Sequence, residues 1–169
     1  MSIIHFTTLH PRTDTRIRVK ETASLARTLT EPVSLYVQDG RGNEQGSDGV
    51  DVVDTGPPPA SRAARMTLGA WRMYRAVRRA RPTIAHFHDP ELIPIALLLQ
   101  MAGIHVIYDV HEDLPRQILG KHWLPAWFRR PIGLLASLLE RAASRAFSGF
   151  ICATPTIAER FPPERTITV

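Results

Sequence analysis

One stretch of the chain decides its fold: Thr83–Glu112, which reads TIAHFHDPELIPIALLLQMAGIHVIYDVHE. It contains two short runs of strand-forming residues, Thr83–Phe87 and His105–Tyr108, separated by an apolar helical segment, Leu92–Ala102. Gly103 is typical of a residue that ends such a helix. A strand, a helix and a second strand in this order form a β-α-β unit, in which the two strands are parallel. The sequence therefore predicts a parallel sheet.

Polar side chains gather where each of these two strands ends. The first cluster is His88–Leu92 and the second is Asp109–Glu112. Open α/β sheets bind ligands at the carboxyl ends of their strands, so we expect the two clusters to lie side by side along one cleft. Carboxylates and imidazoles form hydrogen bonds with hydroxyl groups, which favours a hydroxyl-rich ligand. The candidate binding residues are Asp89, Glu91, Asp109 and Glu112.

His111 is the candidate catalytic residue, because an imidazole titrates near neutral pH and can hold or polarise a reacting hydroxyl group. Its neighbours also have simpler interpretations. Asp89 precedes Pro90 and is suited to cap the following helix. Asp109 is suited to an Asx turn, and His86 to the protein interior.

The rest of the chain alternates strand and helix patterns, which predicts an α/β fold with a Rossmann-like, doubly wound parallel sheet of about six or seven strands. We expect one domain over residues 1–169, with Asp14 as the N-cap of its first helix. Further strands are expected at Ile3–Phe6, Val33–Val37, Val50–Val53, Gly149–Ala153 and Thr166–Val169. Helices are expected at Arg16–Leu29, Ser61–Arg81, Pro131–Phe147 and Pro155–Arg160. The segment Gln38–Gly49 is expected to be a loop, and the buried stripe of the long helix to be Leu134, Leu135, Leu138, Leu139 and Ala142.

The formal net charge is +5, and Ser61–Arg81 contains arginines but no acidic residue. Met66, Ala70, Met73 and Val77 form the packing face of this helix, and the arginines either face water or meet phosphate groups. A second segment, His122–Arg130, mixes aromatic and basic residues, which suits a membrane interface or a packed loop. The residues expected at an anionic membrane surface are Arg72, Arg75, Arg79, Trp123, Trp127, Arg129 and Arg130. No nucleic-acid-binding motif accompanies the arginines, so nucleic acid is not an expected partner.

Several kinds of site find little support. His86 and His88 point the same way on a strand, yet no further ligand follows at metallohydrolase spacing, so we expect no metal and no cofactor. His5 and His10 lie far from them in the sequence. Phosphate-loop, dinucleotide-binding and serine-hydrolase motifs are absent. The single cysteine, Cys152, lies in a strand-like apolar run and fits a core thiol in a reducing compartment. We expect a cytoplasmic protein, at most peripheral to the inner face of the plasma membrane, since no signal peptide or spanning segment is visible.

Taken together, His88-Asp89-Pro90-Glu91-Leu92 and Val106-Ile107-Tyr108-Asp109-Val110-His111-Glu112 resemble the N-terminal domain of bacterial family-4 glycosyltransferases with the GT-B fold. The segment Asp14–Lys20 resembles the start of the first helix in such enzymes. Leu139-Glu140-Arg141 and Ala153–Ala158 resemble the closing helix and the sixth-strand region. The similarity extends over almost the whole chain.

The resemblance implies an enzyme whose N-terminal half binds a glycan or lipid-linked acceptor and whose C-terminal half binds a nucleotide-sugar. The reaction would be hexosyl transfer to an acceptor hydroxyl with retention of the anomeric configuration, in synthesis of a bacterial surface polysaccharide. It would need no obligatory metal, and the nucleotide-sugar would be a co-substrate. His111 matches a histidine close to the transferred sugar, and Asp89 and Glu91 match the motif after the fourth strand.

The chain departs from the family pattern in two ways. Its first loop, Thr7–Thr13, has no glycine, so contact with the donor diphosphate would fall to Arg12, Arg16 or Lys20. The Glu-x7-Glu pair of the donor-binding domain is also missing from the sequence. We therefore expect the donor domain to be absent from these 169 residues and the isolated chain to be inactive. A non-catalytic α/β binding module and, with less support, a metal-dependent hydrolase remain the alternatives.

Overall fold

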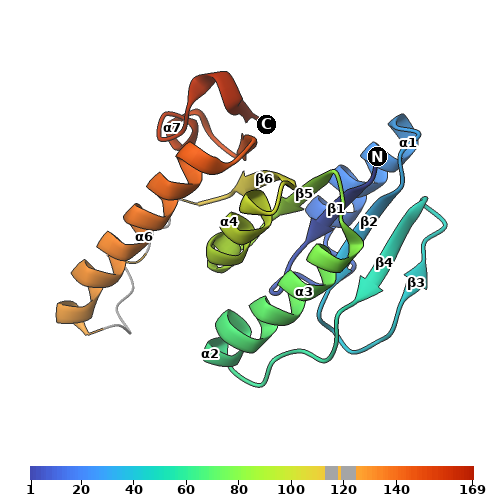
Figure 1. Ribbon diagram of the computed structural model, residues 1–169, viewed down its shortest axis with the longest axis horizontal. Coiled ribbons are helices and arrows are strands. Elements are labelled where there is room, and N and C mark those ends of the chain that lie inside the picture. The colour runs from blue at the N-terminus through green and yellow to red at the C-terminus, as the bar shows by residue number, and fades with distance from the viewer. Residues whose placement is uncertain (113–117, 119–124) are drawn as a thin grey trace. The chain divides into compact units, whose positions relative to one another are not determined.

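The computed structural model describes residues 1–112, 118 and 125–169, and these form two compact units, Met1–Val106 and Ile107–Val169 (Figure 1). The segment Asp113–Lys121, which the sequence predicts to be a loop with a turn of helix, lies outside the described residues except for Ile118, which is helical.

The first unit is built on a sheet with the strand order β3-β4-β2-β1-β5. Its strands are β1 (Ile3–Phe6), β2 (Val33–Val37), β3 (Glu44–Gln45), β4 (Val50–Asp54) and β5 (Ile84–Phe87). The strand β1 lies between β2 and β5, and all pairings are parallel except that of β3 with β4. The amide of His105 donates to the carbonyl of Thr83, so β6 (His105–Val110) starts beside β5 and completes the predicted β-α-β unit.

The helices of this unit follow the predicted order. They are η1 (Thr15–Thr22), α1 (Ala23–Thr28), α2 (Arg62–Ala64), η2 (Arg65–Gly69), α3 (Ala70–Ala80), η3 (Pro90–Leu92) and α4 (Ile93–Met101). The Asp14 cap is confirmed, because its carboxylate accepts hydrogen bonds from the amides of Arg16 and Ile17, both at 2.9 Å. Gly103 follows α4 with a φ of 83°, a conformation that glycine adopts without strain.

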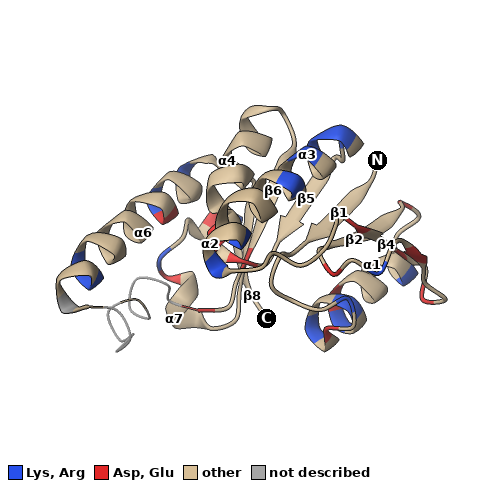
Figure 2. Ribbon diagram, turned by 90° about the horizontal axis from the view of Figure 1, so that it is seen from below, with Lys and Arg blue, Asp and Glu red and all other residues tan. Residues whose placement is uncertain are grey.

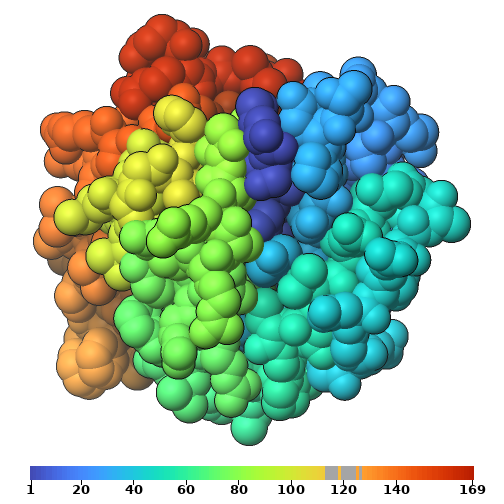
Figure 3. Space-filling model, turned by 45° about the vertical axis from the view of Figure 1, so that its right-hand side comes forward, coloured from blue at the N-terminus to red at the C-terminus, as the bar shows by residue number. Residues whose placement is uncertain are grey.

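The packing face of the arginine-rich helix is as predicted except at one residue. Ala70, Met73 and Val77 are buried, whereas Met66 is 51% exposed. Met66 lies in η2, which is wound as a π-helix. A π-helical turn contains more residues than an α-helical turn, so the α-helical spacing does not carry Met66 onto the buried face. Figure 3 shows the green surface of this helix bordering the blue-green surface of residues 38–56, where Gln38 Nε2 donates to the carbonyl of Gly69 at 2.6 Å.

The sequence predicts that Gln38–Gly49 is a loop, but in the structure this segment is not a simple loop. It contains β3, which pairs antiparallel with β4. Two buried or partly buried arginines from the first loop and η1 hold it: Arg12 contacts Asp39 and Glu44, and Arg18 contacts Asp48 and Glu44. The glycines and polar residues predicted a loop, but these long-range ion pairs order it.

The second unit contains parallel strands in the order β6-β7-β8, with β7 at Gly149–Cys152 and β8 at Thr166–Thr168. Its helices are α6 (Ala126–Ala146), α7 (Pro155–Ala158) and η4 (Pro163–Arg165). Cys152 is buried in β7, as predicted. Among the described residues, no helix combines the length and apolar character needed to cross a bilayer.

The predicted buried stripe of α6 is wrong. Leu134, Leu135 and Leu138 are 63%, 57% and 51% exposed. The buried stripe consists of smaller and polar residues at helical spacing: Gly133, Ala136, Glu140 and Ala143. Both stripes have a helical period, and periodicity alone does not decide which one faces the protein. The helix also begins five residues before the expected Pro131, which lies inside it.

The predicted α/β class with a parallel sheet is confirmed. The described residues contain eight strands rather than six or seven, because β3 arises within the expected loop.

Candidate functional site

The carboxyl end of β5 holds the first loop of the chain through Asp89. The Asp89 carboxylate, 1% exposed, accepts hydrogen bonds from the amides of Thr8 at 2.5 Å and Leu9 at 3.2 Å. The hydroxyl groups of Thr7 and Thr8 lie 2.9 and 3.2 Å from its Oδ2. Asp89 occupies the N-cap position of η3, as predicted, but its carboxylate makes no cap hydrogen bond there. Asp89 instead fixes the loop after β1.

This arrangement explains how the first loop is ordered although it contains no glycine. In a glycine-rich loop, backbone amides can approach a bound phosphate. Here the amides of Thr8 and Leu9 point at Asp89, and the amide of His10 donates to the hydroxyl of Thr7 at 3.0 Å. Three successive amides are thus engaged within the protein. The loop is preorganised by its own side chains.

His10 extends the loop toward the first helix. Its Nδ1 lies 3.2 Å from the Asp14 carboxylate and its Nε2 lies 3.6 Å from that of Asp89. Burial would raise the pKa of Asp14, but the hydrogen bonds from the Ile17 amide and from His10 lower it below its ordinary value. The carboxylate that caps η1 is therefore also part of the site edge.

Glu91 is paired rather than open to a ligand. It forms an ion pair with Arg65 of η2, and the Thr8 hydroxyl lies 3.4 Å from its Oε1. Its side chain is only 13% exposed. Glu91 thus joins the first loop to the arginine-rich helix.

The three cations proposed for phosphate contact have different surroundings. Arg12 is 6% exposed, and its guanidinium contacts Asp39 at 2.6 Å and Glu44 at 3.1 Å. This pairing lowers the pKa of the Asp39 carboxyl. Arg16 contacts Glu21 at 3.1 Å, whereas Lys20 is exposed. Lys20 is thus the most accessible of these three cations.

At the end of β6, Asp109 and His111 form a pair. Asp109 Oδ2 lies 2.9 Å from His111 Nε2, and the carboxylate is fully buried while the imidazole is 24% exposed. A buried carboxylate this close to one imidazole nitrogen favours one orientation of the ring. The pair lies beside Cys152, whose pKa is raised to about 11 by burial and by the charge of Asp109. Glu112, the remaining predicted binding residue, is exposed.

His88–Leu92 belongs to the first unit and Asp109–Glu112 to the second. Their juxtaposition along one cleft therefore stays a prediction. Within the first unit, the structure brings in residues that sequence reasoning passed over: Thr7, Thr8, His10, His5 and Glu21. These residues could have been found from the expected position of β1 beside β5. This order is common in doubly wound sheets and places the carboxyl ends of the two strands together.

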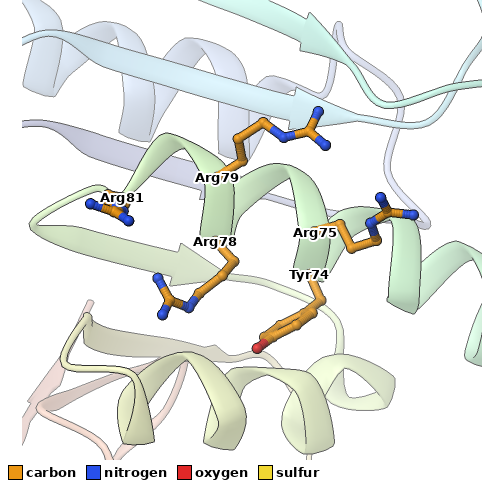
Figure 4. Close-up of a pocket in the computed structure, with 5 residues that line it drawn as sticks. All are labelled: Tyr74, Arg75, Arg78, Arg79 and Arg81. Atoms are coloured by element: carbon orange, nitrogen blue, oxygen red, sulfur yellow. The ribbon is translucent and has the colours of Figure 1, made fainter.

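The arginine-rich surface lies elsewhere on the first unit. Arg72, Arg75 and Arg79 of α3 are exposed. Figure 2 shows blue segments of basic residues along α3. An open pocket of about 500 Å³ is lined by Tyr74, Arg75, Arg78, Arg79 and Arg81. Tyr74 and Arg78 point to one side of the helix and Arg79 to the other (Figure 4). Because Arg81 just precedes β5, this pocket is near the amino end of that strand, opposite the edge that carries Asp89.

The predicted aromatic surface is visible in part. Trp127 is 73% exposed and Phe128 41%, with their rings stacked at 3.8 Å. Arg130 is exposed beside them, Arg129 is partly buried, and Trp123 lies outside the described residues. With the leucines of α6, this end of the second unit presents both apolar and basic side chains.

Comparisons with known proteins agree with this fold. The model of Glycosyltransferase Family 4 matches residues 20–163. Among solved structures, sucrose-phosphate synthase from Thermosynechococcus elongatus is similar with a TM-score of 0.65 and 9% identity, over 99% of this chain and 87% of that chain. No curated protein was found to match. The family match covers most of the chain and the parallel α/β fold agrees with it, so the chain belongs to glycosyltransferase family 4 and has the Rossmann-like fold of a GT-B N-terminal domain.

Proposed function

We propose that this chain is the acceptor-binding half of a retaining glycosyltransferase, which moves a hexosyl unit from a nucleotide-sugar to an acceptor hydroxyl. The observation that carries the proposal is the Asp109–His111 pair at the end of β6, within the segment matched by the family model. The exposed imidazole edge suits contact with a sugar hydroxyl, while the buried carboxylate orients the ring.

We further propose that the donor nucleotide binds chiefly to a second domain. Leaving diphosphate needs cationic or helix-terminus stabilisation. In this chain Arg12 and Arg16 are paired with carboxylates, and the amides of the first loop are engaged by Asp89 and Thr7. The sequence also has no Glu-x7-Glu pair. We also propose that the enzyme is cytoplasmic, that it acts in surface-glycan synthesis, and that its acceptor is a glycan or a lipid-linked glycan.

The test uses the polypeptide of the complete reading frame. It is incubated with radiolabelled UDP-glucose, UDP-galactose, UDP-N-acetylglucosamine or GDP-mannose and with a solvent extract of membranes from the source cells. We expect label from one donor to appear in the glycolipid or glycan fraction, and NMR of the product to show the donor's anomeric configuration. Absence of transfer from every donor contradicts the proposal, and an inverted product contradicts retention.

Two variants and one shorter chain complete the test. His111→Ala is expected to lower the rate by about 10² or more, the usual effect of losing a positioned imidazole. His105→Ala removes an exposed histidine of the same strand and serves as the matched control. The 169-residue chain alone is expected to be inactive, and turnover by it contradicts the division between the two domains.

A further inference from the structure

Three buried histidines and one glutamate meet on one face of the first sheet. They are His5, Glu21, His86 and His88, and one donor atom from each lies within 4.8 Å of the others. His5 of β1 is the register partner of His86 of β5, and His88 follows two residues later. Alternate residues of an extended chain point to the same side, so the pairing of β1 with β5 brings the imidazoles together. Glu21 reaches them from η1.

The cluster is unusual for its position. Strands at the centre of a parallel sheet are normally apolar on both faces. Here the three histidines are 0%, 3% and 2% exposed, and their ring centroids lie 4.4, 4.8 and 5.4 Å apart. Burying polar rings is costly unless their nitrogen atoms are engaged. A ligand common to the rings is one way to engage them, beside the hydrogen bonds that they form within the protein.

The distances suit a metal ion. His5 Nδ1 and His88 Nε2 are 3.2 Å apart. Two ligand atoms at about 2.0–2.1 Å from a tetrahedral zinc ion are about 3.3–3.4 Å from each other. Glu21 Oε2 lies 3.9 Å from His5 Nδ1 and 3.8 Å from His88 Nδ1. The first of these separations exceeds hydrogen-bond length but leaves the carboxylate within reach of an ion held by His5 Nδ1 and His88 Nε2. The second involves the other nitrogen of His88, which does not bind the same ion.

Glu21 also has an orienting partner. Arg16 Nε contacts its Oε1 at 3.1 Å, which leaves Oε2 as the oxygen closest to the histidines. Such outer contacts fix the position of metal-ligating carboxylates. The Glu21 side chain is 20% exposed and offers the side from which an ion can enter.

We propose that His5, His86, His88 and Glu21 form a structural Zn²⁺ site that joins β1, β5 and η1. Three imidazoles and one carboxylate favour zinc over Mg²⁺ or Ca²⁺, which prefer oxygen ligands. Four protein ligands make a closed site, the arrangement of structural rather than catalytic zinc. The site lies next to Asp89 in the chain, so the ion would stiffen the strands that carry the first loop. The sequence alone favoured no metal, because these residues come from three distant segments.

The experiment uses untagged protein dialysed against a chelator and then titrated with Zn²⁺. We expect about one tightly bound zinc ion per chain by elemental analysis and a higher melting temperature with zinc than without, because an ion that binds only the folded chain stabilises it. Substitution with Co²⁺ should give the strong visible absorption of a tetrahedral site. The wild-type protein alone provides these three measurements, so they do not depend on the folding of any variant.

Variants then identify the ligands. His88→Asn and His86→Asn should weaken zinc affinity at least tenfold, since even outer contacts are worth about 10–100-fold. Glu21→Gln keeps the shape of the side chain and should weaken affinity while the far-UV circular dichroism stays unchanged. His105→Asn is the matched control and should bind zinc like the wild type. Folded wild-type protein that neither retains zinc nor melts higher with it would overturn the proposal and leave the imidazoles joined by hydrogen bonds. Equal affinity in His88→Asn and wild type would also overturn it. None of these readouts depends on glycosyl transfer.

Discussion

The carboxylate of Asp89 accepts a hydrogen bond from the backbone amide of Thr8 at 2.5 Å, and the two residues are 81 positions apart in the sequence. This contact joins the ends of β1 and β5, the two neighbouring strands that open the candidate site. It shows that the carboxylate of Asp89, in the motif after β5, holds the first loop in place. A ligand at this site would therefore contact the residues around Asp89 rather than Asp89 itself.

Asp89→Asn tests this role. The amide keeps the shape of the carboxylate but directs an N–H group toward donors, so a buried charge-assisted network is broken. We expect the free energy of unfolding to fall by about 2–3 kcal/mol, measured by urea denaturation. Asp51→Asn makes the same change at an exposed position of β4 and should have little effect. Equal stability of the two variants would show that Asp89 does not fix the loop.

The Arg12–Asp39 pair predicts a specific response to acid. Because the pKa of Asp39 is lower in the folded chain than its ordinary value, through hydrogen bonding to Arg12, the pair stabilises the fold above the unfolded pKa of about 4. This stabilisation is lost as the pH falls through the folded pKa. In Arg12→Gln the unfolding free energy should therefore be lower at neutral pH and should decrease less between about pH 5 and pH 3.

The control for this measurement is Arg27→Gln, which changes an exposed arginine of α1. Asp14, Asp48 and Asp54 also have lowered pKa values and contribute to the acid sensitivity of every variant. The informative quantity is thus the difference between Arg12→Gln and wild type. Parallel pH profiles for the two would contradict the assignment.

Cys152 should be unreactive in the native protein. With a pKa raised to about 11 by burial and by Asp109, only about one thiol in a thousand is ionised at pH 8, and the thiolate is the reactive form. We expect no prompt reaction with a disulfide reagent until the chain is unfolded in urea, when one thiol per chain should react. Cys152→Ser provides the blank. Rapid labelling of the folded protein at pH 8 would show that β7 opens readily.

The exposed end of α6 predicts binding to anionic membranes. Removing two basic groups near a charged surface costs about 1 kcal/mol each, so Arg129→Gln with Arg130→Gln should weaken binding to vesicles containing phosphatidylglycerol by about tenfold or more. Trp127→Ala should weaken binding to neutral and anionic vesicles alike, because it removes exposed apolar surface. Vesicle flotation at low and high salt measures both effects. Binding that is indifferent to lipid charge would contradict the electrostatic part.

The carboxylate of Asp109 and the imidazole of His111 illustrate what the sequence reveals about chemistry. The two residues are nearly adjacent in the chain, and the end of a predicted strand was enough to locate them. Their 2.9 Å contact required the structure. The same holds for Glu91. The sequence predicts it to be a binding residue, and only the structure shows that it pairs with Arg65.

The sequence by itself determined the features that depend on short-range physics. The strands Ile3–Phe6 and Val33–Val37, the cap at Asp14 and the end of α4 near Gly103 follow from residue preferences within a few positions. The α/β class follows from the alternation of such elements.

Only the tertiary structure decided which surfaces meet. It turned Leu134 and Leu138 outward and a stripe of smaller residues inward, although both stripes have the same period. It gathered His5, Glu21 and His86 from three segments, and it aimed Asp89 at Thr8 rather than at its own helix. The reason is that strand order and register fix contacts between residues far apart in the chain, and no local pattern contains that information.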